Sequence, residues 1–336
     1  MMRLPPFRYL APRTAREAAR ILADNGPEAM AVAGGTDLYP NMKRRQFTPK
    51  VLVGLRGLAG AAEIHANGDL RLGALATLTE VSGSAVVSRR WPAVARSAGL
   101  VSSPPLRNAG TIGGNLCVDT RCNYYNQSEF WRASIGYCMK KDGDICLVAP
   151  GSKVCWALSS SDTAPVLWSM GATVTLSGPG GERRIPIAGL YQDDGIVYLS
   201  KRPDEVLTEI ALPPAGDLRS AYLKLRRRGS FDFPVLGVAA ALRMDGDVVR
   251  EARIVLGAVA SLPREAVEAG ALLAGRRLTA ELIDEAAGVA SRPSKPLDNT
   301  DLTHPYRKKM TRVFVTRALR RLAGLPERAD DTGAGT

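Results

Sequence analysis

The sequence predicts an α+β protein built from two domains that meet near residue 215. The chain has 336 residues, 45% of them hydrophobic, which suits two or three domains with sizeable cores. Segments typical of helices and of strands are mixed along the first 215 residues. After that point the pattern changes to a β-hairpin followed by helices, so we expect a second, smaller domain there.

The first domain begins with a helix whose start and end are both marked. Thr14-Ala15-Arg16-Glu17 has the form of a capping box, and Gly26 can end the helix. Residues 29–33 form a short apolar run, which predicts a buried strand leading into Gly34-Gly35-Thr36-Asp37. The other expectations for this domain are strands at 50–55, 70–75, 172–177 and 195–200, mostly helical structure over 76–98, a loop at 102–105, and apolar structure again over 165–170.

The second domain is expected to contain a β-hairpin. Two apolar runs, residues 235–243 and 249–259, flank Met244-Asp245-Gly246-Asp247, and an Asp-Gly pair between such runs is typical of a hairpin turn. A shorter strand-like segment, residues 221–226, precedes them. We expect helices at 264–273, 280–292 and 306–322, and disorder over the tail, residues 326–336.

The composition argues against several classes of protein. The most apolar run, residues 233–242, is too short to cross a bilayer, and MMRLPPFRYLAP lacks the apolar stretch of a secretory signal. We therefore expect a cytoplasmic protein with no membrane partner. The net charge is +12, but the basic clusters are not interleaved with aromatic residues, so no nucleic acid is expected. The charge indicates either solvated surface or a docking face for an acidic partner.

Two loops have a similar composition: AVAGGTDL, residues 31–38, and AGTIGGNL, residues 109–116. Glycine lets backbone N–H groups converge on an anion without a Cβ in the way. Neither loop is a GxGxxG or a P-loop motif, which disfavours a nicotinamide dehydrogenase and a P-loop ATPase. From the residues alone, the loops are either two tight turns or a cradle for a dinucleotide pyrophosphate.

Four of the five cysteines lie in one polar segment, residues 121–155. In a reducing compartment, clustered cysteines bind metal more often than they form disulfides. The spacing contains neither the CxxC of structural zinc sites nor the CxxCxxC run of ferredoxins. Zinc, an iron–sulfur cluster and unrelated thiols therefore all stay open on the residues alone, although a segment with so few apolar residues would need a clasp to become ordered.

A set of motifs in a fixed order resembles one known family. VAGGTDLYPNMKRR, RNAGTIGGNLC, SSDTAPVL and SAYLKLRRRGSFDFPVLGVAAAL are similar to the FAD-binding medium subunit of the xanthine dehydrogenase/molybdenum hydroxylase family, over about residues 4–322. The resemblance implies a two-lobed FAD-binding domain of the vanillyl-alcohol-oxidase (PCMH) type over residues 1–215. It implies a smaller α+β domain with an antiparallel sheet over residues 216–325.

The same resemblance implies a set of FAD contacts and assigns no catalytic acid or base to this chain. Asp162 matches the acidic residue near the flavin ring. The expected contacts are Ala31, Val32, Ala33, Gly34, Gly35, Thr36, Asp37 and Leu38 in the first loop, Val101, Thr111, Ile112, Gly113, Gly114 and Asn115 in a second strip, and Asp162, Leu207 and Lys224 further on.

The cysteine segment is extra length compared with most of this family. Asp162 lies 47 positions after Asn115, where most relatives have only a few residues. An insertion here, at about residues 117–156, resembles the beta subunit of 4-hydroxybenzoyl-CoA reductase, in which it holds a [4Fe–4S] cluster. The resemblance implies that the metal ligands are Cys122, Cys138, Cys146 and Cys155 and that Cys117, beside the flavin loop, is not one of them.

The function implied is electron transfer within a larger enzyme. Electrons would pass from ferredoxin through the [4Fe–4S] cluster and FAD to a small [2Fe–2S] subunit and a large molybdopterin subunit, in a dimer of heterotrimers that dehydroxylates 4-hydroxybenzoyl-CoA. Basic residues beside the insertion would attract an acidic donor: Arg121, Arg132, Lys140, Lys141 and Lys153. The alternatives are the medium subunit of another molybdenum hydroxylase, a stand-alone FAD oxidoreductase with a structural metal, and a metal-stabilised binding module.

Overall fold

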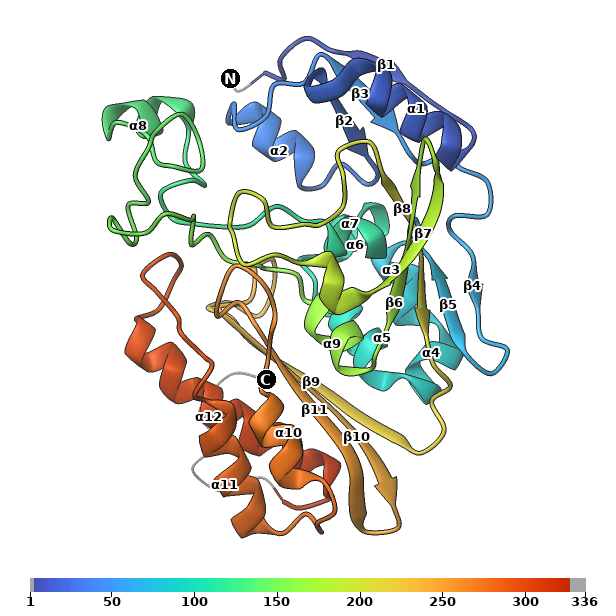
Figure 1. Ribbon diagram of the computed structural model, residues 1–336, viewed down its shortest axis with the longest axis vertical. Helices are drawn as coiled ribbons and strands as arrows, with labels where there is room; N and C mark the ends of the chain where they lie inside the picture. The colour runs from blue at the N-terminus through green and yellow to red at the C-terminus, as the bar shows by residue number, and fades with distance from the viewer. Residues whose placement is uncertain (1–2, 327–336) are drawn as a thin grey trace.

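The computed structural model describes residues 3–326, and this part of the chain folds around three β-sheets (Figure 1). From top to bottom in Figure 1 these are a three-stranded, a five-stranded and a four-stranded sheet, each with helices packed against it. The predicted α+β class is confirmed. Of the tail predicted to be disordered, residues 327–336 lie outside the described residues.

The N-terminal lobe is a parallel sheet covered by a helix that begins and ends where the sequence predicts. Thr14 Oγ1 accepts a hydrogen bond from the Glu17 amide at 3.1 Å, and Gly26, with φ of 51°, ends the helix. The helix buries Ala18 and Leu22 against the strands. The elements of this lobe, with strand order β1-β3-β2, are β1 (Arg8–Leu10), α1 (Ala15–Asn25), η1 (Gly26–Glu28), β2 (Ala29–Val32), α2 (Leu38–Lys43) and β3 (Val51–Gly54).

The second lobe is built on an antiparallel sheet with strand order β4-β5-β8-β6-β7. Its strands come from both sides of the cysteine segment, so that β8 lies between β5 and β6. The core of this lobe includes the fully buried Trp91 and Leu72. Its elements are β4 (Ile64–His65), β5 (Leu70–Gly73), α3 (Leu78–Gly83), α4 (Ala85–Arg90), α5 (Pro92–Gly99), α6 (Pro104–Ala109), α7 (Ile112–Leu116), α9 (Thr163–Ser169), β6 (Thr173–Gly178), β7 (Gly181–Pro186), η2 (Ile187–Leu190) and β8 (Val206–Leu212).

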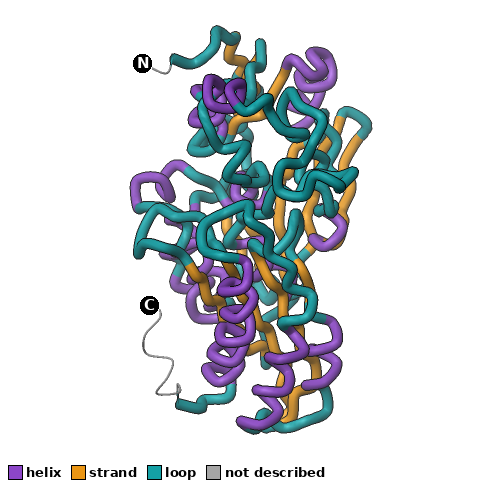
Figure 2. The backbone as a smooth tube through the Cα atoms, turned by 90° about the vertical axis from the view of Figure 1, so that its left-hand side faces the viewer, coloured by secondary structure: helices purple, strands orange, loops and turns teal. Residues whose placement is uncertain are grey.

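The C-terminal domain is a sheet with strand order β12-β11-β10-β9, and its helices lie along one face (Figure 2). Successive residues of β10 face opposite sides: Val238 and Leu242 join the core under the helices, whereas Ala239 and Ala241 join the core of the first domain. The strand is therefore apolar on both faces. The elements are β9 (Leu218–Leu225), β10 (Leu236–Asp245), β11 (Val248–Gly257), β12 (Arg264–Glu265), α10 (Val267–Leu273), α11 (Ala280–Ala290) and α12 (His304–Leu322).

The cysteine segment projects to one side of these sheets and contains a single short helix among its described elements, α8 (Glu129–Ser134) (Figure 1). It is fastened at its base by backbone hydrogen bonds rather than by a sheet. Arg121 and Leu158 exchange a pair of them, at 2.8 and 2.7 Å, and the Asn123 amide donates to the Asn299 carbonyl of the C-terminal domain at 2.9 Å. The segment therefore contacts both domains.

Several local expectations differ from the structure. Residues 195–200 form no strand, because the backbone of Gly195 bonds the insertion: its amide donates to the Cys155 carbonyl and its carbonyl accepts from Lys140. The expected loop at 102–105 is a loop only at residues 102–103, because α6 begins at Pro104, and the expected helix at 264–273 starts with β12. Strands β1, β4, β7 and β8 were not predicted. Of the helices in residues 3–326, none is long and apolar enough to span a membrane.

The packing of α10 on β11 can be tested at Gly270. Helix propensity alone predicts that alanine at a helical glycine stabilises a protein by up to about 1 kcal/mol. A Cβ at Gly270, however, would lie 2.4 Å from the carbonyl oxygen of Ala252 in β11. We therefore expect Gly270→Ala to lower the free energy of unfolding, measured by urea denaturation. The control Gly288→Ala in α11, whose Cβ would meet no described atom within 4 Å, should be neutral or stabilising; equal effects would contradict this packing.

Candidate flavin pocket and four-cysteine cavity

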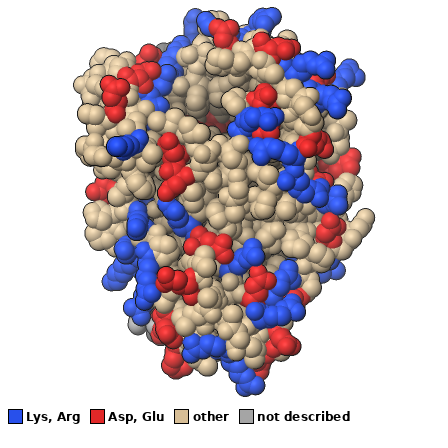
Figure 3. All heavy atoms as spheres, in the orientation of Figure 1, with Lys and Arg blue, Asp and Glu red and all other residues tan. Residues whose placement is uncertain are grey.

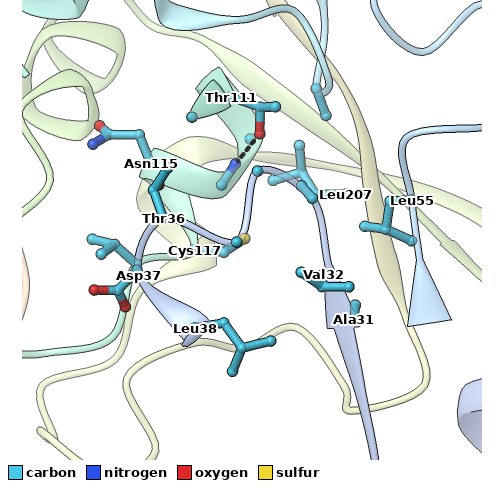
Figure 4. A pocket seen from close by; sticks show the side chains of 18 of the residues that line it. Ala31, Val32, Thr36, Asp37, Leu38, Leu55, Thr111, Asn115, Cys117 and Leu207 are labelled. Carbon is cyan, nitrogen blue, oxygen red and sulfur yellow. Dashed lines mark hydrogen bonds between the residues drawn. The ribbon is translucent and has the colours of Figure 1, made fainter. Parts of the chain in front are cut away.

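A deep pocket opens between the two glycine loops, with β8 on its far side (Figure 4). Figure 4 shows Asp37 and Thr36 near Asn115 at one side, and Leu55 and Leu207 at the other. The polar loops and the apolar wall therefore occupy different parts of one cavity. Of the predicted flavin contacts, all line this pocket except Ile112, Asp162 and Lys224.

The glycines of the first loop are required by packing inside the protein. A Cβ on Gly34 would lie 2.1 Å from the carbonyl oxygen of Ala109, so the two loops approach closely only because residue 34 is glycine. Gly35 has φ of +72°, and a Cβ there would lie 2.3 Å from the ring of Tyr39. Both positions shape the pocket indirectly, by letting the backbone pass where a side chain would collide.

The second loop is held by its own polar side chains. Thr111 caps α7, its Oγ1 accepting a hydrogen bond from the Gly114 amide at 3.0 Å (Figure 4). Asn115 Oδ1 accepts from the hydroxyls of Ser161 at 2.8 Å and Thr163 at 2.7 Å. These bonds fix the loop to the start of α9, on the other side of the cysteine segment. Gly114 has more free space, since a Cβ there would approach Thr111 Oγ1 alone, at 2.9 Å.

The three predicted contacts that do not line the pocket lie behind its wall. Ile112 is fully buried in the core. Asp162 and Lys224 form a buried ion pair of 2.9 Å, and the Tyr222 hydroxyl donates to the same carboxylate at 2.8 Å. Burial raises the pKa of Asp162 and lowers that of Lys224, and each charge offsets the shift of the other. Lys224 Nζ also donates to the Leu100 carbonyl at 3.0 Å, next to a pocket-lining residue.

The sequence does not indicate several of the residues that line the pocket, because they lie in irregular segments without a recognisable motif. Glu205 is an example: Arg183 donates to both of its oxygens, at 2.7 and 2.9 Å, and this hydrogen bonding lowers the pKa of Glu205. Cys117 also lines the pocket, and burial raises the pKa of its thiol. Lining residues that sequence reasoning missed include Leu55, Cys117, Asp119, Tyr198, Lys201, Glu205 and Phe233.

The other four cysteines come together. Cys122, Cys138, Cys146 and Cys155 are all buried and line one small cavity, with Tyr125 and Lys140 also in its wall. Burial raises the pKa of Cys122 to about 12 and that of Cys155 to about 11, so both thiols are protonated at neutral pH. Cysteines that are up to 33 positions apart in the sequence thus lie around one cavity, as a shared ligand site requires.

The space between these thiols is tight. It measures about 10 Å³, room for roughly one water molecule. Within residues 3–326, no three His, Cys, Asp or Glu side chains are grouped so that they could hold a metal ion. The four thiols are therefore gathered but would have to move apart or reorient to bind a metal centre.

The prediction that basic residues beside the insertion attract a donor is wrong for most of the residues named. Arg121 and Arg132 are buried, the side chain of Lys140 is 6% exposed, and all three make internal hydrogen bonds or ion pairs. Lys141 is partly exposed and Lys153 exposed. Over the face seen in Figure 3, basic and acidic side chains are interspersed. Three of the five basic side chains named therefore lie inside the protein, where they cannot form part of an exposed docking face.

The two glycine loops can be distinguished by substitution. We expect Gly34→Ala to lower both the free energy of unfolding without cofactor and the FAD retained on purification, because the loops must separate by more than 1 Å. Gly114→Ala should lower the free energy of unfolding less than Gly34→Ala, since its Cβ would meet only the Thr111 hydroxyl, and should weaken FAD binding, since Gly114 lines the pocket. Urea denaturation and FAD titration measure the two effects; full stability of Gly34→Ala would contradict the loop contact.

Comparison with known proteins agrees with this geometry. The family described as FAD binding domain in molybdopterin dehydrogenase matches residues 5–215, and the CO dehydrogenase flavoprotein C-terminal domain matches residues 220–322. The carbon monoxide dehydrogenase medium chain of Afipia carboxidovorans is 30% identical, over 94% of this chain and 96% of that protein. The aldehyde oxidoreductase FAD-binding subunit of Escherichia coli is 33% identical, over 76% of this chain and 82% of that subunit.

The fold is similar to solved structures over nearly its whole length. A chain of reconstituted CO dehydrogenase from Oligotropha carboxidovorans superposes with a TM-score of 0.79 at 28% identity, covering 97% of this chain and 100% of that one. The two matched families meet between β8 and β9, where the sheets of the two domains also separate. The chain therefore belongs to the family of FAD-binding medium subunits of molybdenum hydroxylases.

Proposed function

We propose that this chain is the FAD-carrying electron-transfer subunit of a molybdenum hydroxylase, bound to a large molybdopterin subunit and a small [2Fe–2S] subunit. The observation that carries the proposal is the pocket between the glycine loops, within a domain of the FAD-binding family. When bound there, FAD supplies the electron transfer. The chain's own residues bind and orient it.

The charged residues of the pocket support a binding role over acid–base catalysis. Asp37 pairs with Arg121, Asp119 with Lys140 and Glu205 with Arg183. Lys201, the remaining charged residue lining the pocket, donates to two backbone carbonyls. A general acid or base must be free to exchange a proton with substrate. In the described pocket each charged side chain already has a partner, so we infer that the chemistry on the substrate falls to other subunits.

We infer that this chain does not determine the substrate specificity of the holoenzyme. Two relatives with similar identity to this chain, 30% and 33%, carry names that refer to different substrates, carbon monoxide and aldehydes. Both are nevertheless flavin subunits of the same kind. A shared flavin subunit with different substrates is expected when the substrate binds elsewhere in the enzyme. The holoenzyme's reaction therefore has to be inferred from features of this chain outside the flavin pocket.

The four-cysteine cavity is such a feature, and we propose that it holds a [4Fe–4S] cluster. Around one zinc ion, Zn–S bonds of about 2.3 Å place tetrahedral thiolates about 3.8 Å apart. In a four-iron cluster each thiolate binds a different iron, so the sulfurs stand farther apart. The side chains present are chemically suitable ligands for such a cluster, because the cavity offers four buried thiols in a mostly apolar wall. The tight space means that the loops carrying the cysteines would spread on binding.

The cluster would make 4-hydroxybenzoyl-CoA reductase the second, more specific candidate. An extra centre at the protein's edge, beside the flavin pocket, is an entry point for electrons from a low-potential donor such as ferredoxin. Electrons would then flow towards molybdenum, and the substrate would lose its phenolic hydroxyl. What supports this candidate is the convergence of four buried cysteines in one cavity.

The cluster can be tested by metal analysis of the full chain purified without oxygen. We expect about four irons and four sulfides per chain, and their loss when any one of Cys122, Cys138, Cys146 or Cys155 is changed to Ser. Cys117→Ser is the matched control, because Cys117 lines the flavin pocket instead. It should keep its iron. One zinc per chain, or iron that survives all four changes, would contradict the proposal.

The reaction can be tested on the holoenzyme assembled with its partner subunits. With reduced ferredoxin we expect dehydroxylation of 4-hydroxybenzoyl-CoA, and no turnover by this chain alone. Cys146→Ser in the holoenzyme should stop ferredoxin-driven turnover, whereas dithionite should still reduce the FAD that remains bound. Oxidation of carbon monoxide or an aldehyde, without dehydroxylation, would assign the holoenzyme to another branch and leave the flavin-subunit proposal standing.

A further inference from the structure

One buried lysine touches the walls of both cavities. Lys140 comes from the cysteine segment, and its side chain is 6% exposed. Its ammonium donates to Asp119 Oδ1 at 2.8 Å, to Thr120 Oγ1 at 2.7 Å and to the Gly195 carbonyl at 2.6 Å. A lysine has three N–H donors, so these three acceptors saturate it. The residue is thus held in one position between separate stretches of chain.

The partners of Lys140 belong to different sites. Asp119, 7% exposed in its side chain, lines the flavin pocket, whereas Lys140 lines the four-cysteine cavity. The ammonium also lies 4.7 Å from the ring centre of Tyr125 in the cysteine cavity and 5.5 Å from that of Tyr198 in the flavin pocket. Cation–π contacts at these distances are attractive. One charge therefore contacts an aromatic ring on each side and an acidic group on the flavin side.

A second link runs alongside the first. Arg121 is next to Cys122, and it pairs with Asp37 in the first glycine loop. Its guanidinium also lies 4.3 Å from the ring centre of Phe233, another residue that lines the flavin pocket. The cysteine segment thus contributes two cations to groups that form the wall of the flavin pocket.

Removing Lys140 would leave a buried carboxylate without its cation. Lys140 is the cation paired with the Asp119 carboxylate, at Oδ1, while Oδ2 is buried without a geometric hydrogen bond in the described structure; the nearby Tyr125 hydroxyl is neutral, and its pKa is raised by burial and by Asp119. Losing one partner of a buried ion pair is strongly unfavourable, because the other charge stays desolvated. The Asp119 side chain would then turn towards water or another donor, and the wall of the flavin pocket would change with it.

We propose that Lys140 is a positioning residue that couples the two sites, so that FAD binding and the order of the cysteine segment stabilise each other. The proposal rests on FAD binding in the pocket but not on which metal the cysteines hold. Energetic coupling is reciprocal: if the ordered segment favours FAD, then FAD must favour the ordered segment to the same degree. Both directions can be measured.

The first experiment measures hydrogen exchange in the full chain with and without FAD. We expect FAD to slow exchange of backbone amides in residues 121–155, although most of that segment lies outside the pocket. Unchanged exchange in the wild-type chain would overturn the proposal, whatever any variant does. Iron analysis on the same samples distinguishes the two proposals. If FAD slows exchange in a sample that contains no iron, the coupling proposal stands and only the cluster proposal is contradicted.

The second experiment compares Lys140→Met with its neighbour Lys141→Met. Lys141 is 31% exposed in its side chain and pairs with Asp142 at the surface, so it is a matched control. We expect Lys140→Met to raise the dissociation constant for FAD at least about fivefold. It should also abolish the FAD-dependent protection of the segment and change the visible circular dichroism of bound FAD. Lys141→Met should behave as wild type.

Rescue and a double variant separate this role from general instability. Lys140→Arg keeps the positive charge and should restore most of the FAD affinity. In Lys140→Met/Asp119→Asn no unpaired buried carboxylate is left, so its loss of affinity should be smaller than the sum of the two single losses. Additive losses, or wild-type FAD affinity and protection in Lys140→Met, would overturn the proposal.

Discussion

The close approach of two backbone loops at Gly34 and Ala109 is the constraint on which the flavin site depends. The loops belong to different lobes and meet where a Cβ would lie 2.1 Å from a carbonyl oxygen. Because they meet there, β2 and α7 direct their polar ends into one pocket, and the apolar residues of β8 close the opposite side. A dinucleotide needs this combination, since its phosphates seek backbone N–H groups and its ring seeks an apolar wall.

The cysteine segment obtains its order from ion pairs and hydrogen bonds instead of a hydrophobic core of ordinary size. Its apolar cluster consists of a few residues around the thiols, such as Tyr125 and Ala157. Buried cations, Lys140 and Arg121, join it to acids of the flavin pocket. Such pairs add little net stability but specify one geometry, because a misplaced segment would leave charges buried and alone. The segment is thereby held beside the flavin pocket.

This arrangement also explains the division of labour within the enzyme. Charges near the flavin are committed to holding the pocket, and the Asp162–Lys224 pair supports its wall from behind by bonding the Leu100 carbonyl. A pocket whose charges are paired internally suits the binding and orientation of a cofactor that exchanges electrons. The family to which the chain belongs contains subunits of enzymes with different substrates, which agrees with a shared electron-transfer module.

The sequence by itself determined the elements whose signals are local. Thr14 and Gly26 mark the ends of α1, the Asp245-Gly246 pair marks the β10–β11 hairpin, and paired glycines mark the two pocket loops, because caps and turns act over a few residues. Tertiary structure decided which charges are buried. Lys140 meets Asp119 across 21 positions and Lys224 meets Asp162 across 62, and no local pattern encodes such contacts. The same holds at Gly195, whose backbone bonds the insertion instead of a neighbouring strand.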